Sequence, residues 1–156
     1  MYKQSLLLNL YSESNNQLLI KNQSIIESLI PISVQKYYEL LLSNPETTKF
    51  LTNELVENRL INSLQTWLTS VLSAKQEDEI EALLKQQRHI GQVHARINVD
   101  MSLVSEAMIV LKNSLHQGLL DHPTADRKIL LVIHNILDFA LMNINKVYFS
   151  DFTNVE

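Results

Sequence analysis

The sequence predicts an all-α fold, and its composition and its hydrophobic pattern support this prediction. The chain has 156 residues, of which 46% are hydrophobic and only 2 are glycine and 3 are proline. It is therefore poor in the residues that end helices and form tight turns. Apolar residues recur every three or four positions over most of its length, as in amphipathic helices. Its length suits one domain with a sizeable core.

The charge and the residue types exclude several classes of function. A net charge of −4 gives no electrostatic reason to expect nucleic acid as a partner. The absence of cysteine excludes disulfides, thiolate metal sites and thiol nucleophiles. The first residues turn polar too soon for a signal peptide, and no apolar run approaches the about 20 residues that span a bilayer. We therefore expect a soluble, cytoplasmic domain that contacts neither nucleic acid nor membrane.

The first half of the chain is expected to hold a lead-in and two main helices. Residues 1–22 are polar with scattered leucines, which indicates a weakly specified lead-in with at most a short helix. A helical pattern begins at Gln23 and ends near Asn44, and Pro31 either kinks it or starts a new helix. A corner over residues 45–52 follows. A long helix then spans residues 53–73, and its inward face is Val56, Leu60, Leu64, Trp67, Leu68 and Val71.

Three further helices are predicted in the second half. The first opens near Gln76, where acidic residues complement the helix dipole, and breaks at residues 98–100. Asp100 is a suitable N-cap for the next helix, which is expected to run to Gly118. The last helix is expected to start at Pro123 and continue to about Phe149.

The last helix is apolar over too much of its circumference for burial on one side. Ile129, Ile133, Ile136 and their neighbours form one face, while Leu130 and Leu131 spread onto another. Such a helix is usually buried on two sides, and in so small a domain the second side is expected to contact a partner subunit. On this interpretation Ile136→Glu would yield monomers.

His94 is the candidate functional residue with the most support from the sequence. It lies on the apolar stripe of its helix, one turn after Gly91, and a glycine in mid-helix costs about 1 kcal/mol relative to alanine. A haem lying against this helix, with its iron bound by His94, would account for both residues, since imidazole is a normal axial ligand of haem iron. From these residues alone, the simpler alternative is that His94 is a hydrogen-bonded core histidine and that Gly91 lies where two helices cross.

Other catalytic or metal-binding arrangements find little support. The two glycines cannot make a phosphate-binding loop, and the acidic residues 77–81 are best explained as a solvated helix start. His89 lies about 140° around the helix from His94, so the two cannot share a metal ion. Surface or interface positions are expected for the three remaining histidines, which are His116, His122 and His134.

A haem site would also need groups on its distal side. The helix of Tyr37 and Tyr38 offers a phenol, which can donate a hydrogen bond to a gas ligand that carries partial negative charge. The helix of Leu60 and Ser63 offers an apolar wall and a hydroxyl group. Alternatively, the two tyrosines are ordinary half-buried aromatics, and the periodicity of the sequence fits both interpretations.

The chain resembles the haem-binding globin domains of globin-coupled sensors, above all the oxygen-sensor domains of bacterial diguanylate cyclases. The resemblance runs from about Gln35 to Phe152. Its most specific stretches are the run from Phe50 to Glu57, the run from Trp67 to Ala74, and Val93-His94-Ala95-Arg96-Ile97. There are two departures. Asn98 stands where relatives usually carry glycine, and the segment between Trp67 and His94 is one residue longer.

The resemblance implies the roles of the site residues. His94 matches the proximal ligand of haem b, and Tyr38 matches the distal tyrosine that hydrogen-bonds bound oxygen. Leu60 matches a distal leucine that controls water access, and Ser63 falls where some relatives carry a second polar distal residue. Together with Gly91, these residues are the predicted haem-binding set, and His94 is the predicted metal ligand.

The resemblance also implies an architecture and partners. It predicts a globin-like sensor domain over residues 23–152, whose long final helices form a dimeric four-helix bundle, followed by a tail over residues 153–156. Oxygen, or alternatively CO or NO, would be the ligand. The chain itself would be a non-enzymatic sensor for a C-terminal output domain, a diguanylate cyclase, which is absent from this sequence. It would then be either an excised sensor domain or a natural single-domain form. The alternatives are a haem-free, globin-like interaction module in stress signalling, and an enzyme that acts on oxygen or nitric oxide with a reductase partner.

Overall fold

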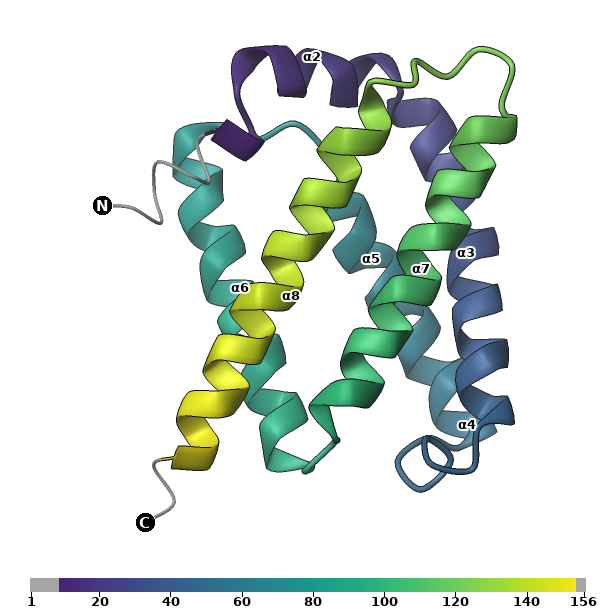
Figure 1. Ribbon diagram of the computed structural model, residues 1–156, viewed down its shortest axis with the longest axis vertical. Coiled ribbons are helices and arrows are strands. Elements are labelled where there is room, and N and C mark those ends of the chain that lie inside the picture. Colours follow the sequence, from purple (N-terminus) through teal and green to yellow (C-terminus); the bar gives the residue numbers. More distant parts are fainter. Residues whose placement is uncertain (1–8, 154–156) are drawn as a thin grey trace.

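The computed structural model describes residues 9–153, and these residues form helices and loops without a strand (Figure 1). This confirms the predicted all-α fold; the residues beyond 153, predicted as a tail, lie outside the described part. The elements are α2 (Glu13–Lys21), α3 (Gln23–Ser43), α4 (Asn53–Leu55), the π-helix η1 (Val56–Leu60), α5 (Ile61–Val71), α6 (Glu77–Arg96), α7 (Met101–Asp121) and α8 (Ile129–Thr153).

The two long C-terminal helices organise the domain. Figure 1 shows α7 and α8 as an antiparallel pair, with α6 beside α8 and α3 beside α7. Helix α5 packs on α3, and α2 crosses one end of the bundle and contacts α8. The two helices also supply most of the largest fully buried side chains, which include Leu111, Leu115, Ile129, Ile133, Ile136 and Leu137. The core therefore lies between this pair and the helices behind it.

Helix α8 contains a longer apolar stretch than we expect from the sequence. Ile129–Val147 is long and apolar enough to cross a membrane by length and composition, although half of this stretch is buried within the domain. The expectation that no apolar run approaches the length of a span is thus wrong for α8. Its burial is what a core helix of a globular domain shows.

The predicted lead-in contains α2 and belongs to the same core as the rest of the chain. Leu19 is buried, and the buried Tyr11 hydroxyl donates to the carbonyl oxygen of Val71 at 2.7 Å. The Asn16 side chain bonds both the N–H and the carbonyl oxygen of Lys75. The predicted division at residue 22 therefore does not correspond to a boundary in the packing.

Three predicted boundaries of the last two helices differ from the structure, and one of them is the end of α8, which lies at Thr153 and not near Phe149. Helix α7 does not end at Gly118 but runs on to Asp121, because this glycine serves packing: a Cβ there would lie 2.7 Å from Leu29 of α3. Helix α8 begins at Ile129, not at Pro123. Pro31 lies inside α3, so the alternative in which it starts a new helix is wrong.

Ile136 does not face a partner subunit, contrary to the prediction from the sequence. Ile136 is only 1% exposed and lies in the core of the single chain, so a glutamate there would unfold the domain before it revealed an interface. Other large apolar residues of α7 and α8 are exposed, and Leu131 is 66% exposed. These open residues are Ile109, Leu120, Leu131 and Met142.

Candidate functional site

Helix α6 holds the His94 ring in a defined tautomer. The Nδ1 atom lies 2.8 Å from the carbonyl oxygen of Ile90, one turn earlier. Because a carbonyl oxygen can only accept, Nδ1 carries the proton and donates it. In the neutral ring the lone pair is then on Nε2, and this nitrogen is free to bind a metal ion. The half-buried imidazole is thus held by its own helix with Nε2 available to a ligand.

The end of α6 is fixed immediately after His94. The N–H of Val99 donates to the carbonyl oxygen of His94, and the N–H of Asn98 donates to that of Ala95. These two bonds form a Schellman motif, in which the residue after the C-cap adopts the left-handed conformation. Asn98 has φ 57° and is the sole non-glycine residue with positive φ among those described. Asparagine thus performs the role of the glycine expected at this position, and the helix end is preserved.

Substitutions at Asn98 test this helix end. Asn98→Ala is expected to lower the free energy of unfolding by about 1 kcal/mol, because alanine tolerates positive φ less well than asparagine. That loss corresponds to a decrease in Tm of about 2–4 °C for a domain of this size. Asn98→Gly is the matched control and should be at least as stable as the native chain in thermal unfolding. An alanine variant as stable as the glycine variant would contradict the assignment.

The surface of α6 next to His94 is apolar and partly open. At about 100° per residue, Ile90, Val93 and Ile97 fall on one side of His94, and Gly91 falls on the other. Val93 is 38% and Ile97 is 51% exposed, which is unusual for large apolar residues that flank one imidazole. A flat apolar group bound to Nε2 would cover this side.

Gly91 is explained by the crossing of α6 with α8. A Cβ at this position would lie 2.9 Å from the carbonyl oxygen of Ile144 and 3.2 Å from the Cβ of Val147. The helix-crossing alternative therefore accounts for the glycine, and a haem contact is not needed to explain it.

Tyr38 lies inside the domain, where its phenol is kept protonated. Its hydroxyl donates to the carbonyl oxygen of Leu60 at 3.3 Å, and its ring meets Tyr37 edge-on with centroids 4.8 Å apart. Burial, with a smaller contribution from Tyr37, raises the pKa of Tyr38, and burial raises the pKa of Tyr37 to about 12. Both phenols therefore remain hydrogen-bond donors at neutral pH. The structure thus brings the predicted residues Tyr38 and Leu60 into direct contact.

Leu60 is positioned by a π-helix that the sequence did not reveal. Thr52 caps the preceding turn, its hydroxyl accepting from the N–H of Leu55 at 3.1 Å. Val56–Leu60 then form one wide turn, closed by the N–H of Ile61 donating to the carbonyl oxygen of Val56. Such turns are rare and frequently occur at functional sites. Here the wide turn ends at the residue that accepts the Tyr38 hydrogen bond.

Ser63 does not join this group. It is exposed, and its hydroxyl donates to the carbonyl oxygen of Arg59, one turn earlier in the chain, at 3.1 Å. The structure therefore does not place it with the buried Tyr38 hydroxyl.

Two other histidines lie together on the α7–α8 pair. The rings of His116 and His134 have centroids 6.1 Å apart, and the Asp138 carboxylate bonds both His134 and Lys112 of α7. Burial, followed by the charges of His134 and Lys112, lowers the pKa of His116. Among the residues described, no cluster of three or more His, Asp or Glu side chains could hold a metal ion. His94 remains the candidate ligand.

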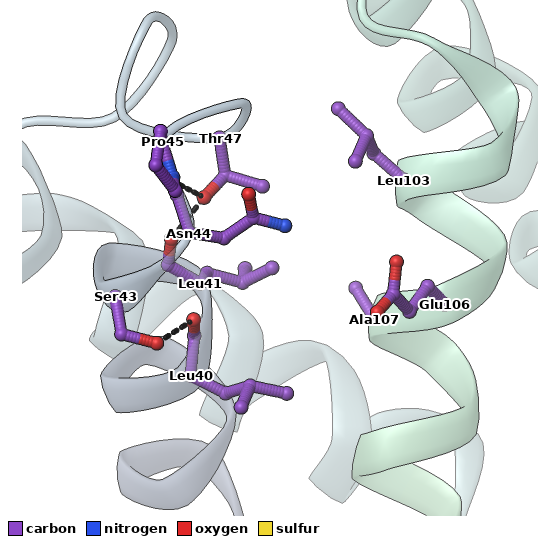
Figure 2. A pocket seen from close by; sticks show the side chains of 9 residues that line it. All are labelled: Leu40, Leu41, Ser43, Asn44, Pro45, Thr47, Leu103, Glu106 and Ala107. Carbon is purple, nitrogen blue, oxygen red and sulfur yellow. Dashed lines mark hydrogen bonds between the residues drawn. The ribbon is translucent and has the colours of Figure 1, made fainter.

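A cleft of about 270 Å³ lies between the end of α3 and the start of α7 (Figure 2). Figure 2 shows Leu40 and Leu41 of α3 on one side of it and Leu103, Glu106 and Ala107 of α7 on the other. Glu106 is its one charged residue, and neither His94 nor Tyr38 lines it. This cleft is separate from the candidate haem site and contains no set of convergent reactive groups.

Comparison with known sequences gives a clear family match. The profile of the Protoglobin family matches residues 3–151. The protein "Diguanylate cyclase DosC" of Shigella flexneri serotype 5b is 32% identical over 120 residues, which cover 74% of this chain and 31% of that protein. The protein of the same name from Escherichia coli K12 is also 32% identical, with 26% of it covered. The chain thus spans about a third or less of these relatives.

Solved structures agree with this match. The ferric crystal structure of the globin domain of E. coli DosC superposes with a TM-score of 0.83 at 25% identity, covering 94% of this chain and 99% of that one. The globin domain of a Geobacter sulfurreducens globin-coupled sensor superposes with a TM-score of 0.77 at 23% identity, covering 93% of this chain and 96% of that one. At that lower identity the likeness concerns the fold alone.

Proposed function

Since the chain belongs to the protoglobin family, we propose that it is a haem-based oxygen-sensor domain that signals to a C-terminal output domain. The observation that carries this proposal is the orientation of His94. Its Nδ1 proton is committed to Ile90, which leaves Nε2 available to iron. The proposal is tested by the visible absorption spectrum of the purified protein, which should show a Soret band that shifts when CO binds the reduced form.

The residues present fit a haem b group. His94 offers an imidazole nitrogen, the usual protein ligand of haem iron. The exposed apolar side of α6, with Val93 and Ile97, offers a surface that a porphyrin would cover. Tyr38, whose buried phenol donates to the carbonyl oxygen of Leu60, would supply the hydrogen-bond donor on the distal side. These three features are those that a gas-binding haem pocket requires.

The haem, when bound, supplies a ferrous iron to which a diatomic gas can bind. The protein's own part is to orient the iron ligand, to donate a hydrogen bond to the gas and to limit the access of water. His94 performs the first task. Tyr38 would perform the second by turning its hydroxyl from the Leu60 carbonyl oxygen toward the gas, with oxygen favoured because it accepts a hydrogen bond. The Leu60 side chain, packed against the core, would perform the third.

We further propose a homodimer in which α7 and α8 of two chains form a four-helix bundle. Ile109 and Leu120 lie eleven residues apart on α7, and Leu131 and Met142 lie eleven residues apart on α8, so each two share one face of their helix. All four are exposed, and a second copy of the α7–α8 pair would cover them. The output domain, by analogy with the named relatives, would be a diguanylate cyclase in the cytoplasm. The cyclase reaction would then belong to that domain, and this domain would regulate it.

The variant Leu131→Glu tests the dimer. Its expected result is a change in solution mass from about twice 18.0 kDa to 18.0 kDa by light scattering, because a buried carboxylate at the interface lacks a partner. The matched control is Ile20→Glu, which changes an equally open residue, 61% exposed, on α2 and should leave the mass unchanged. A Leu131→Glu variant that remains dimeric would place the interface elsewhere.

A further inference from the structure

The His94 helix and the C-terminal helix form the most extensive helix pair of the fold. Helix α6 runs alongside α8 (Figure 1), and their contact surface is mainly apolar. It holds one buried polar pair, Gln87 at 1% exposed and Asn143 at 6%, and the Asn143 Nδ2 donates to the Gln87 Oε1 at 3.0 Å. Among the described side chains of α6 and α8, these two are the buried polar ones.

This pair lies on the same face of α6 as His94. Gln87 precedes His94 by about two turns, and Gly91 lies between them. Gly91 in turn abuts the backbone of Ile144, the residue after Asn143. Along α6 the order is therefore the Gln87–Asn143 hydrogen bond, the close crossing with α8 at Gly91, and then His94.

A buried polar pair constrains the register of two helices more strongly than apolar contacts do. Apolar side chains keep much of their burial when two helices slide, since contact between them is not directional. Two buried amides have one good partner each, and sliding leaves both desolvated and unpaired. A single buried polar contact can therefore set the register of a helix pair.

We propose that the Gln87–Asn143 hydrogen bond locks the register of the His94 helix on α8 and thereby passes a shift of His94 to the C-terminal helix. The inference rests on the proposed haem-based function. The bond makes α6 and α8 move as a unit, so a change at His94 reaches the helix that leads to the C-terminus. Gln87 and Asn143 are thus positioning residues that contact neither the gas nor the iron.

The decisive variant is the double substitution Gln87→Leu/Asn143→Leu. It removes both amides while keeping side chains of similar volume, so the variant should fold. Either single substitution would leave a buried amide without a hydrogen-bond partner. The matched control is Ser33→Ala/Ser114→Ala, which removes a part-buried hydrogen bond of 3.2 Å between α3 and α7, away from the α6–α8 contact.

One measurement needs no haem. The chain has no cysteine, so spin labels can be attached to exposed positions through Arg88→Cys on α6 and Asn145→Cys on α8. Labelled chains are diluted in an excess of unlabelled chain, so that a dimer holds at most one labelled copy. The native background and the serine control should then each give one narrow distance distribution. The double leucine variant should give a second population or a clear shift. An unchanged narrow distribution would overturn the proposed register lock.

The second measurement concerns transmission. In the haem-loaded protein, adding CO to the ferrous form is expected to change amide hydrogen exchange in α8, and the double leucine variant should reduce this change several-fold while keeping the native absorption spectrum. If CO changed the hydrogen exchange of α8 as much in this variant as in the native protein, the inference would be overturned, while the proposed haem function would stand. A protein that binds no haem would instead refute the proposed function and with it the transmission, whereas the spin-label result would still decide the register.

Discussion

His94→Ala is expected to abolish the spectrum of five-coordinate ferrous haem. The substitution removes Nε2, the nitrogen that the Nδ1–Ile90 hydrogen bond leaves available and that would bind the haem iron. Changes to residues that merely support a metal ligand cost about 10–100-fold in metal affinity, so loss of the ligand itself should cost more. The measurement is haem titration followed by absorption spectroscopy of the reduced protein.

His89→Ala is the matched control for this prediction. His89 lies on the same helix, is exposed, and points about 140° away from His94. Its loss should leave haem affinity and spectrum unchanged. If His94→Ala retained the native ferrous spectrum, another residue would have to be the iron ligand.

Tyr38→Phe is expected to speed the dissociation of oxygen by about 10–100-fold and to leave the haem content intact. The estimate corresponds to one hydrogen bond of about 1.4–2.8 kcal/mol in a buried site. Stopped-flow displacement of oxygen by CO gives the rate. Tyr37→Phe is the matched control, because it alters the neighbouring ring that touches Tyr38 edge-on but retains the Tyr38 hydroxyl.

The pH dependence of this rate gives a second criterion. Burial raises the pKa of Tyr38 above its ordinary value, so the phenol stays protonated and continues to donate throughout the neutral range. The native rate of oxygen loss should therefore be constant up to at least pH 10, the usual pKa of tyrosine, and should rise only at higher pH. An unchanged rate in Tyr38→Phe would remove this residue from the mechanism.

The helices with regular patterns and clear caps were predictable from the sequence. The start of α6 near Gln76, its break at residues 98–100 and the capping of α7 by Asp100 all agree with the structure. Their signals are local, since an acidic first turn, an Asx cap and a 3.6-residue period act within a few residues. The same period put His94 on an inward-facing stripe of α6.

Features that depend on tertiary packing were not predictable. The π-helix at Val56–Leu60 contains no distinctive residue type, so the hydrophobic pattern of the sequence does not distinguish it from the α-helical turns on either side. Gly118 suggested a helix end, but its reason lies in Leu29, which is distant in the sequence. The partner of Gln87 is on α8, and nothing near Gln87 in the sequence identifies Asn143.

The burial of the lead-in was likewise not predictable from the local sequence. Its polar composition suggested a segment outside the core, since the apolar residues Tyr11 and Leu19 are isolated in the sequence. Their burial depends on surfaces that α3, α5 and α8 supply only after folding. Tertiary contacts thus override a weak local signal.

The visible absorption spectrum of the purified protein tests the central claim most directly. It should be recorded for the ferric form, after reduction with dithionite, and after exposure to oxygen or CO, with haem added if little is present. The proposed function predicts a strong Soret band that shifts reversibly with each ligand. Absence of a Soret band after haem addition would contradict it and would favour the haem-free, globin-like interaction module.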